Sequence, residues 1–257
     1  TISFMVYCVM DKKLDKSIAE ANEESGEAPE EPFKISDIGM VIKNKGFWLI
    51  ALLCVLFYSG VFPFLKYATD FMINKYGVDP KFAGIIPGLL PFGTILLTPL
   101  FGGIYDQKGK GATIMLIGAF MLVGIHALFA VPAIDSWIFA VLLMILLGVA
   151  FSLVPSAMWP SVPKIIPEKQ LGTAYSLIFW VQNWGLMGVP ALIGWVLEKY
   201  CKTVTVSPAG ESVIHYDYTL PMVIFACFGV LAVVVALALK REDSKKGYGL
   251  QLPNVQK

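Results

Sequence analysis

Six long apolar stretches without a single Asp, Glu, Lys or Arg dominate this chain of 257 residues. They cover residues 47–65, 82–105, 112–134, 137–159, 171–197 and 218–239. Each is close to the roughly 20 residues that a helix rising about 1.5 Å per residue needs to cross a bilayer's hydrocarbon core. A water-soluble domain could not bury six helices that are apolar on every side. The sequence therefore predicts an all-α, polytopic transmembrane bundle with six spans and the lipid bilayer as its solvent.

The charge and the cysteines exclude several other classes of protein. Only 15 % of the residues are charged and the formal net charge is +1, so there is no basic excess to bind nucleic acid. The four cysteines follow no metal-binding spacing, and we expect neither a metal nor another cofactor.

The basic residues predict the orientation of the bundle. If both ends of the chain are cytoplasmic, 15 of the 20 Lys and Arg lie on that side. The five on the other side are Lys66, Lys75, Lys81, Lys199 and Lys202. Cytoplasmic loops carry such an excess of basic residues, and six spans return the chain to the same side.

The parts outside the six spans suggest how the chain is organised. Residues 1–10 are apolar but cover half a membrane, and we expect them to be the end of a preceding transmembrane helix. Residues 11–46 are expected to form a charged cytoplasmic linker and then, near 33–45, either an interfacial helix or an ordinary loop. Residues 47–240 form the six-helix unit, and 241–257 a cytoplasmic tail. In the last outer loop, 203–206 and 212–218 predict a small β-hairpin that either caps an outer vestibule or is a surface loop.

Two neighbouring amides, Gln182 and Asn183, lie near the middle of the fifth span, between Trp180 and Trp184. A buried amide without a partner costs about 1–3 kcal/mol, so these groups need hydrogen bonds. They either bind polar groups of a substrate beside an indole or join helices to one another. Because they are about 100° apart on a helix, at most one should point into a substrate path.

A glycine-rich motif from Gly102 to Lys110 lies in a cytoplasmic hairpin between two spans. Its glycines would let helices approach closely. Asp106 could accept hydrogen bonds from the N-terminus of a neighbouring helix in one conformation and lose them in another, which would make a conformational latch. The alternative is a tight turn whose lysines only fix the topology.

This spacing resembles the loop signature of the Major Facilitator Superfamily, G-x-x-x-D-[RK]-x-G-[RK]-[RK]. Gly102, Asp106, Gly109 and Lys110 match, whereas Gln107 and Gly111 depart from the basic residues expected there. The resemblance implies a 12-helix transporter of which this chain holds helices 7–12, with the N-terminal six-helix half as its partner. Residues 159–175, 182–185 and 57–64 are also similar to the Major Facilitator Superfamily domain-containing protein 1 group, whose animal members are lysosomal dipeptide transporters.

The resemblance also ranks further candidate residues. Tyr58, Phe62 and Ser152 lie on helices that line the cavity in such transporters, although each is more often a packing residue. His126 is the only side chain within a span that titrates near neutral pH and could couple transport to protons. The third helix of each triplet is peripheral in the superfamily, so a structural histidine is favoured.

Together these observations predict the C-terminal half of a secondary transporter that moves a small organic solute by alternating access, with dipeptides suggested by resemblance alone. The alternatives are another solute class, such as a sugar or an organic anion, and less favoured a channel or a membrane-embedded enzyme. The spans hold neither a polar pore lining nor a catalytic set, so no catalytic residue is expected. One Arg against 19 Lys and the absence of glycosylation sequons favour a bacterial inner membrane, with a lysosomal membrane as the eukaryotic alternative.

Overall fold

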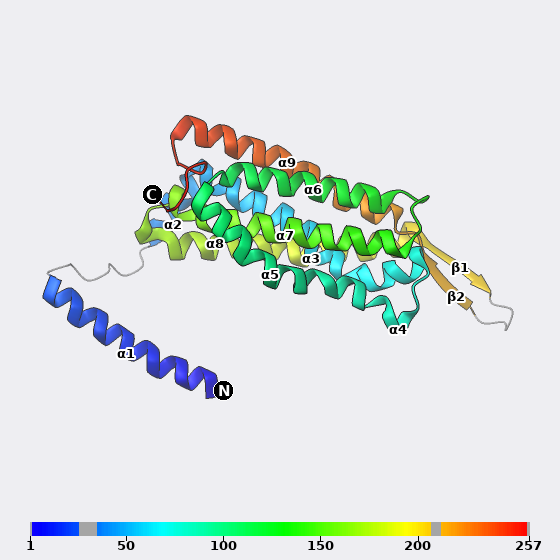
Figure 1. Cartoon of the computed structure of the whole chain (residues 1–257), viewed down its shortest axis with the longest axis horizontal. Coiled ribbons are helices and arrows are strands. Elements are labelled where there is room, and N and C mark those ends of the chain that lie inside the picture. The colour runs from blue at the N-terminus through cyan, green and yellow to red at the C-terminus, as the bar shows by residue number, and fades with distance from the viewer. Residues whose placement is uncertain (1, 26–34, 207–211, 256–257) are drawn as a thin grey trace. The chain divides into compact units, whose positions relative to one another are not determined.

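The computed structural model describes residues 2–25, 35–206 and 212–255 (Figure 1). Within them, six segments are long and apolar enough to cross a membrane, which confirms the predicted all-α bundle. They are α3 (Lys45–Tyr76), α4 with α5 (Pro80–Ala83, Ile85–Lys108), α6 (Gly111–Ala130), α7 (Trp137–Ile165), η1 with α8 and η2 (Glu168–Gln170, Leu171–Val196, Leu197–Cys201) and α9 (Thr219–Lys246).

The first 37 residues form a unit separate from the bundle. Here α1 (Ile2–Ser25) is one continuous helix of 24 residues, so helical structure runs past residue 10 and into the expected linker. The rest of that linker falls largely on residues 26–34, which lie outside the described residues. The short helix α2 (Ile35–Lys43) occupies the place of the expected interfacial helix.

The helices differ in length from the apolar stretches that predicted them. Helix α3 continues eleven residues beyond Leu65 and stops at Gly77, which has a left-handed φ of 61°. Its 32 residues span about 48 Å, more than the hydrocarbon core, so charged residues near its end can reach water. Helix α6 ends at Ala130 instead of residue 134, because Val131 precedes Pro132 and takes an extended conformation.

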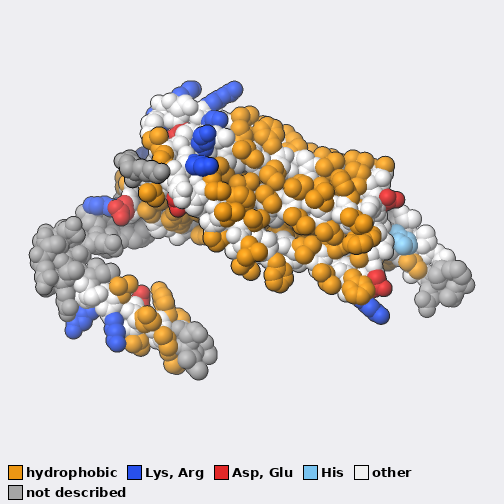
Figure 2. Space-filling view, viewed as in Figure 1, with side chains coloured by type: hydrophobic (Ala, Val, Ile, Leu, Met, Phe, Trp, Pro, Cys, Tyr) orange, Lys and Arg blue, Asp and Glu red, His pale blue; other side chains and the backbone are white. Residues whose placement is uncertain are grey.

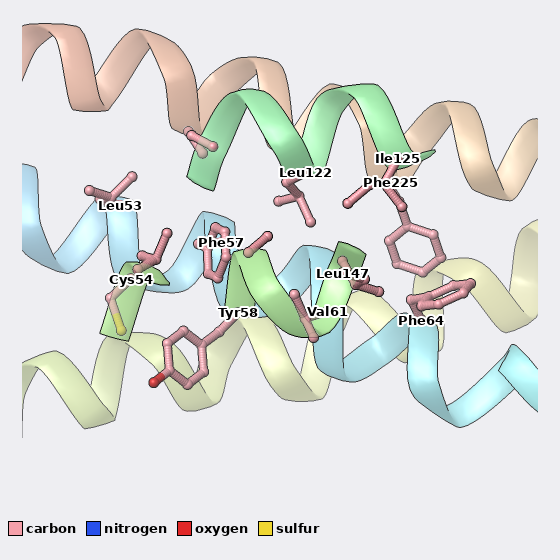
Figure 3. Packing of buried hydrophobic residues seen from close by; sticks show 14 of the residues in the cluster. Leu53, Cys54, Phe57, Tyr58, Val61, Phe64, Leu122, Ile125, Leu147 and Phe225 are labelled. Carbon is pink, nitrogen blue, oxygen red and sulfur yellow. The ribbon is translucent and has the colours of Figure 1, made fainter. Parts of the chain in front are cut away.

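Helix α3 occupies the middle of the bundle and supplies more core residues than any other helix (Figure 3). Its Phe57, Val61 and Phe64 are fully buried, and they pack among residues of the surrounding helices. Those labelled in Figure 3 from α6, α7 and α9 are Leu122, Ile125, Leu147 and Phe225. In the most apolar part of α3, 61 % of the residues are buried. The corresponding share is 17 % for the span of α4 and α5 and 22 % for the span that contains α8. The bundle therefore leaves large parts of α5 and α8 exposed.

These exposed surfaces are strongly apolar. Figure 2 shows hydrophobic side chains covering the face between the two ends of the bundle, with Lys and Arg gathered at the end that carries the C-terminus. On α5, Phe92 and Leu96 are more than two-thirds exposed, and on α8 Trp184 and Met187 are more than half exposed. Lipid or another part of a longer protein must cover such a surface in the membrane.

Small residues allow two helix pairs to approach closely. A Cβ added to Gly185 of α8 would lie 2.4 Å from the Val55 side chain and 2.5 Å from the Ser59 hydroxyl of α3. Gly118 of α6 meets Val154 of α7 in the same way, at 2.3 Å. The close approach expected at Gly102 is not found: among the described residues, nothing lies within 4 Å of a Cβ placed there.

The predicted β-hairpin is confirmed. Strands β1 (Lys202–Val206) and β2 (Ser212–Tyr216) are antiparallel, with Lys202 opposite Tyr216. The Tyr216 N–H donates a 3.0 Å hydrogen bond to the side chain of Asn74, which fixes the base of the hairpin to the outer part of α3.

Candidate functional site

A pocket of about 290 Å³ lies between α3 and α8. Its lining residues are Tyr58, Phe62, Pro63, Lys66, Gln182 and Leu186. Residues four apart on a helix lie on the same face, so Tyr58, Phe62 and Lys66 form one stripe of α3. Three of the predicted substrate-binding residues, Tyr58, Phe62 and Gln182, are thus brought together although two come from one helix and one from another.

Aromatic packing fixes the wall of this pocket. The rings of Tyr58 and Phe62 pack at 5.5 Å between centroids, and Phe151 of α7 lies edge-on to them at 5.5 Å and 5.2 Å. The indole N–H of Trp159 donates a 3.2 Å hydrogen bond to the Tyr58 hydroxyl. Trp159 also stacks on Phe179 of α8 at 5.0 Å. Three helices therefore hold the Tyr58 ring in place.

The polar group on the α8 side is the amide of Gln182, which is buried to 7 % exposure. Its Oε1 accepts a 3.3 Å hydrogen bond from the Cys54 thiol, one turn before Tyr58 on α3. No described residue accepts a hydrogen bond from the Gln182 Nε2. This nitrogen is also not completely buried. Because an amide nitrogen is a double donor, Gln182 can donate to a solute in the pocket while Cys54 orients it.

The other predicted residues do not line the pocket. Asn183 is exposed, and its Nδ2 donates a 2.8 Å hydrogen bond to the Phe179 carbonyl of its own helix. Trp180 is 60 % exposed and lies edge-on to Trp184. Ser152 is fully buried and donates 2.8 Å to the Gly148 carbonyl. The two adjacent amides thus face different surroundings, as their 100° separation requires.

His126 lies in the core, away from the pocket lining. Its ring is enclosed by Phe64, Phe129 and Phe225, at centroid distances of 5.2, 6.3 and 5.4 Å. Nδ1 is 3.0 Å from the Leu122 carbonyl, whereas Nε2 has no partner among the described residues.

Two larger pockets lie near the outer ends of the helices. One, of about 480 Å³, is walled mainly by apolar residues of α3, α5 and α7, with Asp79 as its charged lining residue. The other, of about 440 Å³, lies at the hairpin base and includes Lys75, His215 and Asp217. The Lys75 ammonium already donates to the backbone carbonyls of Phe129 and Val131. Neither pocket is lined by a residue that the sequence predicted to bind substrate.

The glycine-rich motif joins α5 to α6 through an unusual backbone. Gly109 has φ 67° and ψ −133°, and Lys110 has φ 63°. This turn holds residues 247–255 of the chain, which we call the C-terminal strap. The N–H groups of Lys110 and Gly111 donate to the Gln251 and Leu250 carbonyls at 3.0 and 2.8 Å.

The strap also binds Asp106. Its Oδ1 accepts a 2.7 Å hydrogen bond from the Asn254 side chain, and its carbonyl accepts from the N–H groups of Asn254 and Val255 at 3.0 Å. We expected a helix N-terminus as the donor, but the donors belong to the non-helical strap that follows α9. This contact could not be predicted, because no sequence pattern pairs residues that are 148 positions apart.

Further contacts tie the strap to α7 and α9. The Lys164 ammonium donates to the Leu252 carbonyl at 2.7 Å, and Asp243 accepts from the Leu250 N–H at 3.0 Å. Tyr248 is half-buried against the start of α3, and this burial raises the pKa of its hydroxyl, as does the nearby charge of Glu242.

Sequence reasoning missed Lys66 and Leu186 as lining residues of the pocket, and Cys54 as the hydrogen-bond partner of Gln182. Lys66 was assigned to an outer loop because the apolar stretch stops at residue 65. The spacing of four from Tyr58 to Phe62 to Lys66 could have placed it on the same helical face.

Comparison with known proteins places this geometry in a family. The family model described as Major Facilitator Superfamily matches residues 2–190. The chain is 31 % identical over 196 residues to "Lysosomal dipeptide transporter MFSD1" of Gallus gallus, covering 76 % of the chain and 42 % of that protein. It is 29 % identical over 198 residues to the Homo sapiens protein of the same name, covering 77 % and 40 %. The chain thus spans about two fifths of these relatives.

Solved structures with a similar fold are also transporters. A peptide transporter, POT, in complex with sulfate superposes with a TM-score of 0.64 at 16 % identity, covering 82 % of this chain and 40 % of that one. The nucleoside transporter NupG superposes with a TM-score of 0.63 at 20 % identity, covering 79 % and 50 %. At these identities the likeness shows the fold.

Proposed function

The chain belongs to the Major Facilitator Superfamily, and on that premise we propose that it is the C-terminal six-helix half of a secondary transporter for a small organic solute. It is a multi-pass membrane protein of a family of transporters, not an enzyme. The solute would bind between this half and an N-terminal half, and the two halves would rock so that the site opens to one side at a time.

The observation that carries the proposal is the pocket between α3 and α8. It has an aromatic wall formed by Tyr58 and Phe62. It also contains the buried amide of Gln182, whose Nε2 can still donate hydrogen bonds. Binding sites for small molecules combine apolar walls with a few placed polar groups in this way. Asn183, Trp180 and Ser152 lie outside this lining and are not assigned a direct contact with the solute, and His126 serves to pack α6 against α3 and α9.

The uncovered faces of α5 and α8 support an N-terminal half as partner. Both helices are apolar over their length and little buried by this chain. A second bundle packed on them would enclose the pocket from the open side.

Dipeptides are the first substrate candidate, because the relatives with about 30 % identity are named lysosomal dipeptide transporters. A sugar or an organic anion is the alternative, since the matched part covers two fifths of those relatives and leaves most of their length unmatched.

We propose that Gly102, Asp106, Gly109 and Lys110 act as a conformational latch. Asn254 binds one oxygen of the Asp106 carboxylate, and no described residue binds the other. That oxygen can accept a further hydrogen bond from the N-terminal half in one conformation and lose it in the next. A bacterial inner membrane fits the lysine-rich composition, and a lysosomal membrane is the location named for the animal relatives.

The test is uptake by the full-length protein in proteoliposomes. A panel of dipeptides, sugars, nucleosides and organic acids should include a dipeptide that is accumulated and that raises the melting temperature of the purified protein. Uptake of sugars alone would show that the substrate is a sugar and not a dipeptide. A steady ion current without saturable uptake would indicate a channel instead.

A further inference from the structure

One charged side chain, Lys66, belongs to the lining of the pocket between α3 and α8. It lies one helical turn beyond Phe62 and two turns beyond Tyr58, on the same stripe of α3. Its Cα is about 12 Å further along the helix axis than that of Tyr58. The pocket therefore has an ammonium group toward its outer end, an aromatic wall along α3 and an amide on the α8 side.

The positive charge of Lys66 is not neutralised by any described residue. No hydrogen bond or ion pair joins its ammonium to this part of the chain. The carboxylate one turn further on α3 belongs to Asp70, and no ion pair joins it to Lys66. Its Oδ2 accepts hydrogen bonds from the Tyr218 hydroxyl at 2.5 Å and the Asn74 amide at 3.0 Å, so this oxygen is directed toward the outer end of α3 and the hairpin base. Lys66 is thus a cation at a pocket rim with its donors unused.

The chemistry of the pocket selects one kind of ligand. An ammonium group has three donors and no acceptor, so it pairs with an anionic oxygen. Every other lining residue is uncharged, and a volume of about 290 Å³ fits a small molecule. A single positive charge suits a single carboxylate, whereas a phosphate with nearly two charges is usually held by several cationic groups or a helix N-terminus.

We propose that Lys66 binds the carboxylate of the transported solute, so that the substrates are small organic acids. For a dipeptide this group is its C-terminal carboxylate, while the peptide body lies along Tyr58 and Phe62 and accepts a hydrogen bond from Gln182. The inference rests on the proposed function and specifies the substrate class of the same pocket.

The experiment compares pairs of solutes that differ only in this group. Uptake of a dipeptide and of its C-terminal amide is measured with the full-length protein and with Lys66→Met and Lys66→Arg. Lys81→Met serves as the matched control, because Lys81 is an exposed lysine near the same end of α3 and outside this pocket.

The unmodified protein should prefer the free acid, and Lys66→Met should raise the KM for the acid by about tenfold or more, because hydrogen bonds to charged groups are worth at least one tenfold step. The amide should change little, Lys66→Arg should keep most of the preference, and Lys81→Met should behave like the unmodified protein.

An unchanged ratio of acid to amide in Lys66→Met would overturn the inference and leave the transporter assignment intact. Equal losses for acid and amide, together with a lower melting temperature, would show instead that Lys66 pairs with a carboxylate of the N-terminal half. If the unmodified protein carries neutral solutes only, the inference fails while transport stands. If it carries no solute at all, both fail.

Discussion

The side-chain amide of Asn254 donates a 2.7 Å hydrogen bond to the carboxylate of Asp106, across 148 residues of sequence. This contact joins the C-terminal strap to the last turn of α5. It fixes one carboxylate oxygen of Asp106, the acidic residue of the family signature, so the strap and the last turn of α5 should behave as one unit.

A double-mutant cycle should detect that unit. Asp106→Asn and Asn254→Ala should each lower the free energy of unfolding, and the pair should be coupled by about 0.5–1.5 kcal/mol, the net value of a hydrogen bond. Unfolding is followed in detergent micelles for the two single variants and the double variant. Strictly additive effects would show that the contact does not contribute.

Gly109→Ala should weaken strap docking. A Cβ at this φ of 67° would lie 2.5 Å from the Gln251 carbonyl oxygen, so both strain and collision oppose it. We expect the free energy of unfolding to fall by about 1–3 kcal/mol and amide exchange to become faster in residues 247–255. Gly102→Ala is the matched control in the same motif, because its Cβ would meet nothing within 4 Å and alanine favours helix. Equal behaviour of the two variants would contradict the role given to the strap.

Gly185→Ala should damage the pocket without touching its lining. The added methyl would force α8 away from Val55 and Ser59 of α3, which we expect to cost about 1–3 kcal/mol and to reduce uptake. Gly188→Ala, three residues further on the same helix, meets nothing within 4 Å and should keep both stability and uptake. Full uptake in Gly185→Ala would remove the pocket as the substrate site.

The two neighbouring amides should separate in function. Gln182→Ala removes the pocket amide, so it should raise the KM for the substrate by about fivefold to tenfold, the value of one or two net hydrogen bonds. Asn183→Ala removes an exposed side chain bonded to its own helix and should leave uptake near normal. The measurement is the KM for saturable uptake by each variant. A larger effect at Asn183 than at Gln182 would assign the substrate path to the other face of α8.

The docking of Tyr248 predicts a pH dependence. Its pKa is raised by burial in the folded protein, so its stabilising contribution is complete below the ordinary tyrosine pKa of about 10 and decreases at higher pH. Between pH 9 and 11 the unmodified protein should lose more free energy of unfolding than Tyr248→Phe. Parallel pH profiles for the two proteins would contradict this assignment.

Much of the fold was predictable because it depends on local composition. A run of some 20 uncharged apolar residues has one stable state in lipid, a helix with all its backbone groups paired, so the spans could be counted from the chain. The strand-like segments around Ser-Pro-Ala-Gly were sufficient for the hairpin. Helix ends were less predictable, since α3 continues through Lys66 and Asp70 to Tyr76, beyond the end of its apolar stretch.

The site was predictable in part. Gln182, Tyr58 and Phe62 could be singled out as polar or aromatic residues on promising helices, but which of Gln182 and Asn183 faces the pocket depends on the rotation of α8. The sequence by itself determined that this protein is embedded in a lipid bilayer, how many membrane spans it has and which family loop signature it carries. Only the tertiary structure decided that Lys66 joins the pocket and that Asn254 holds Asp106. Periodicity along one helix specifies its faces, whereas the packing of several helices at glycines such as Gly185 decides which faces meet.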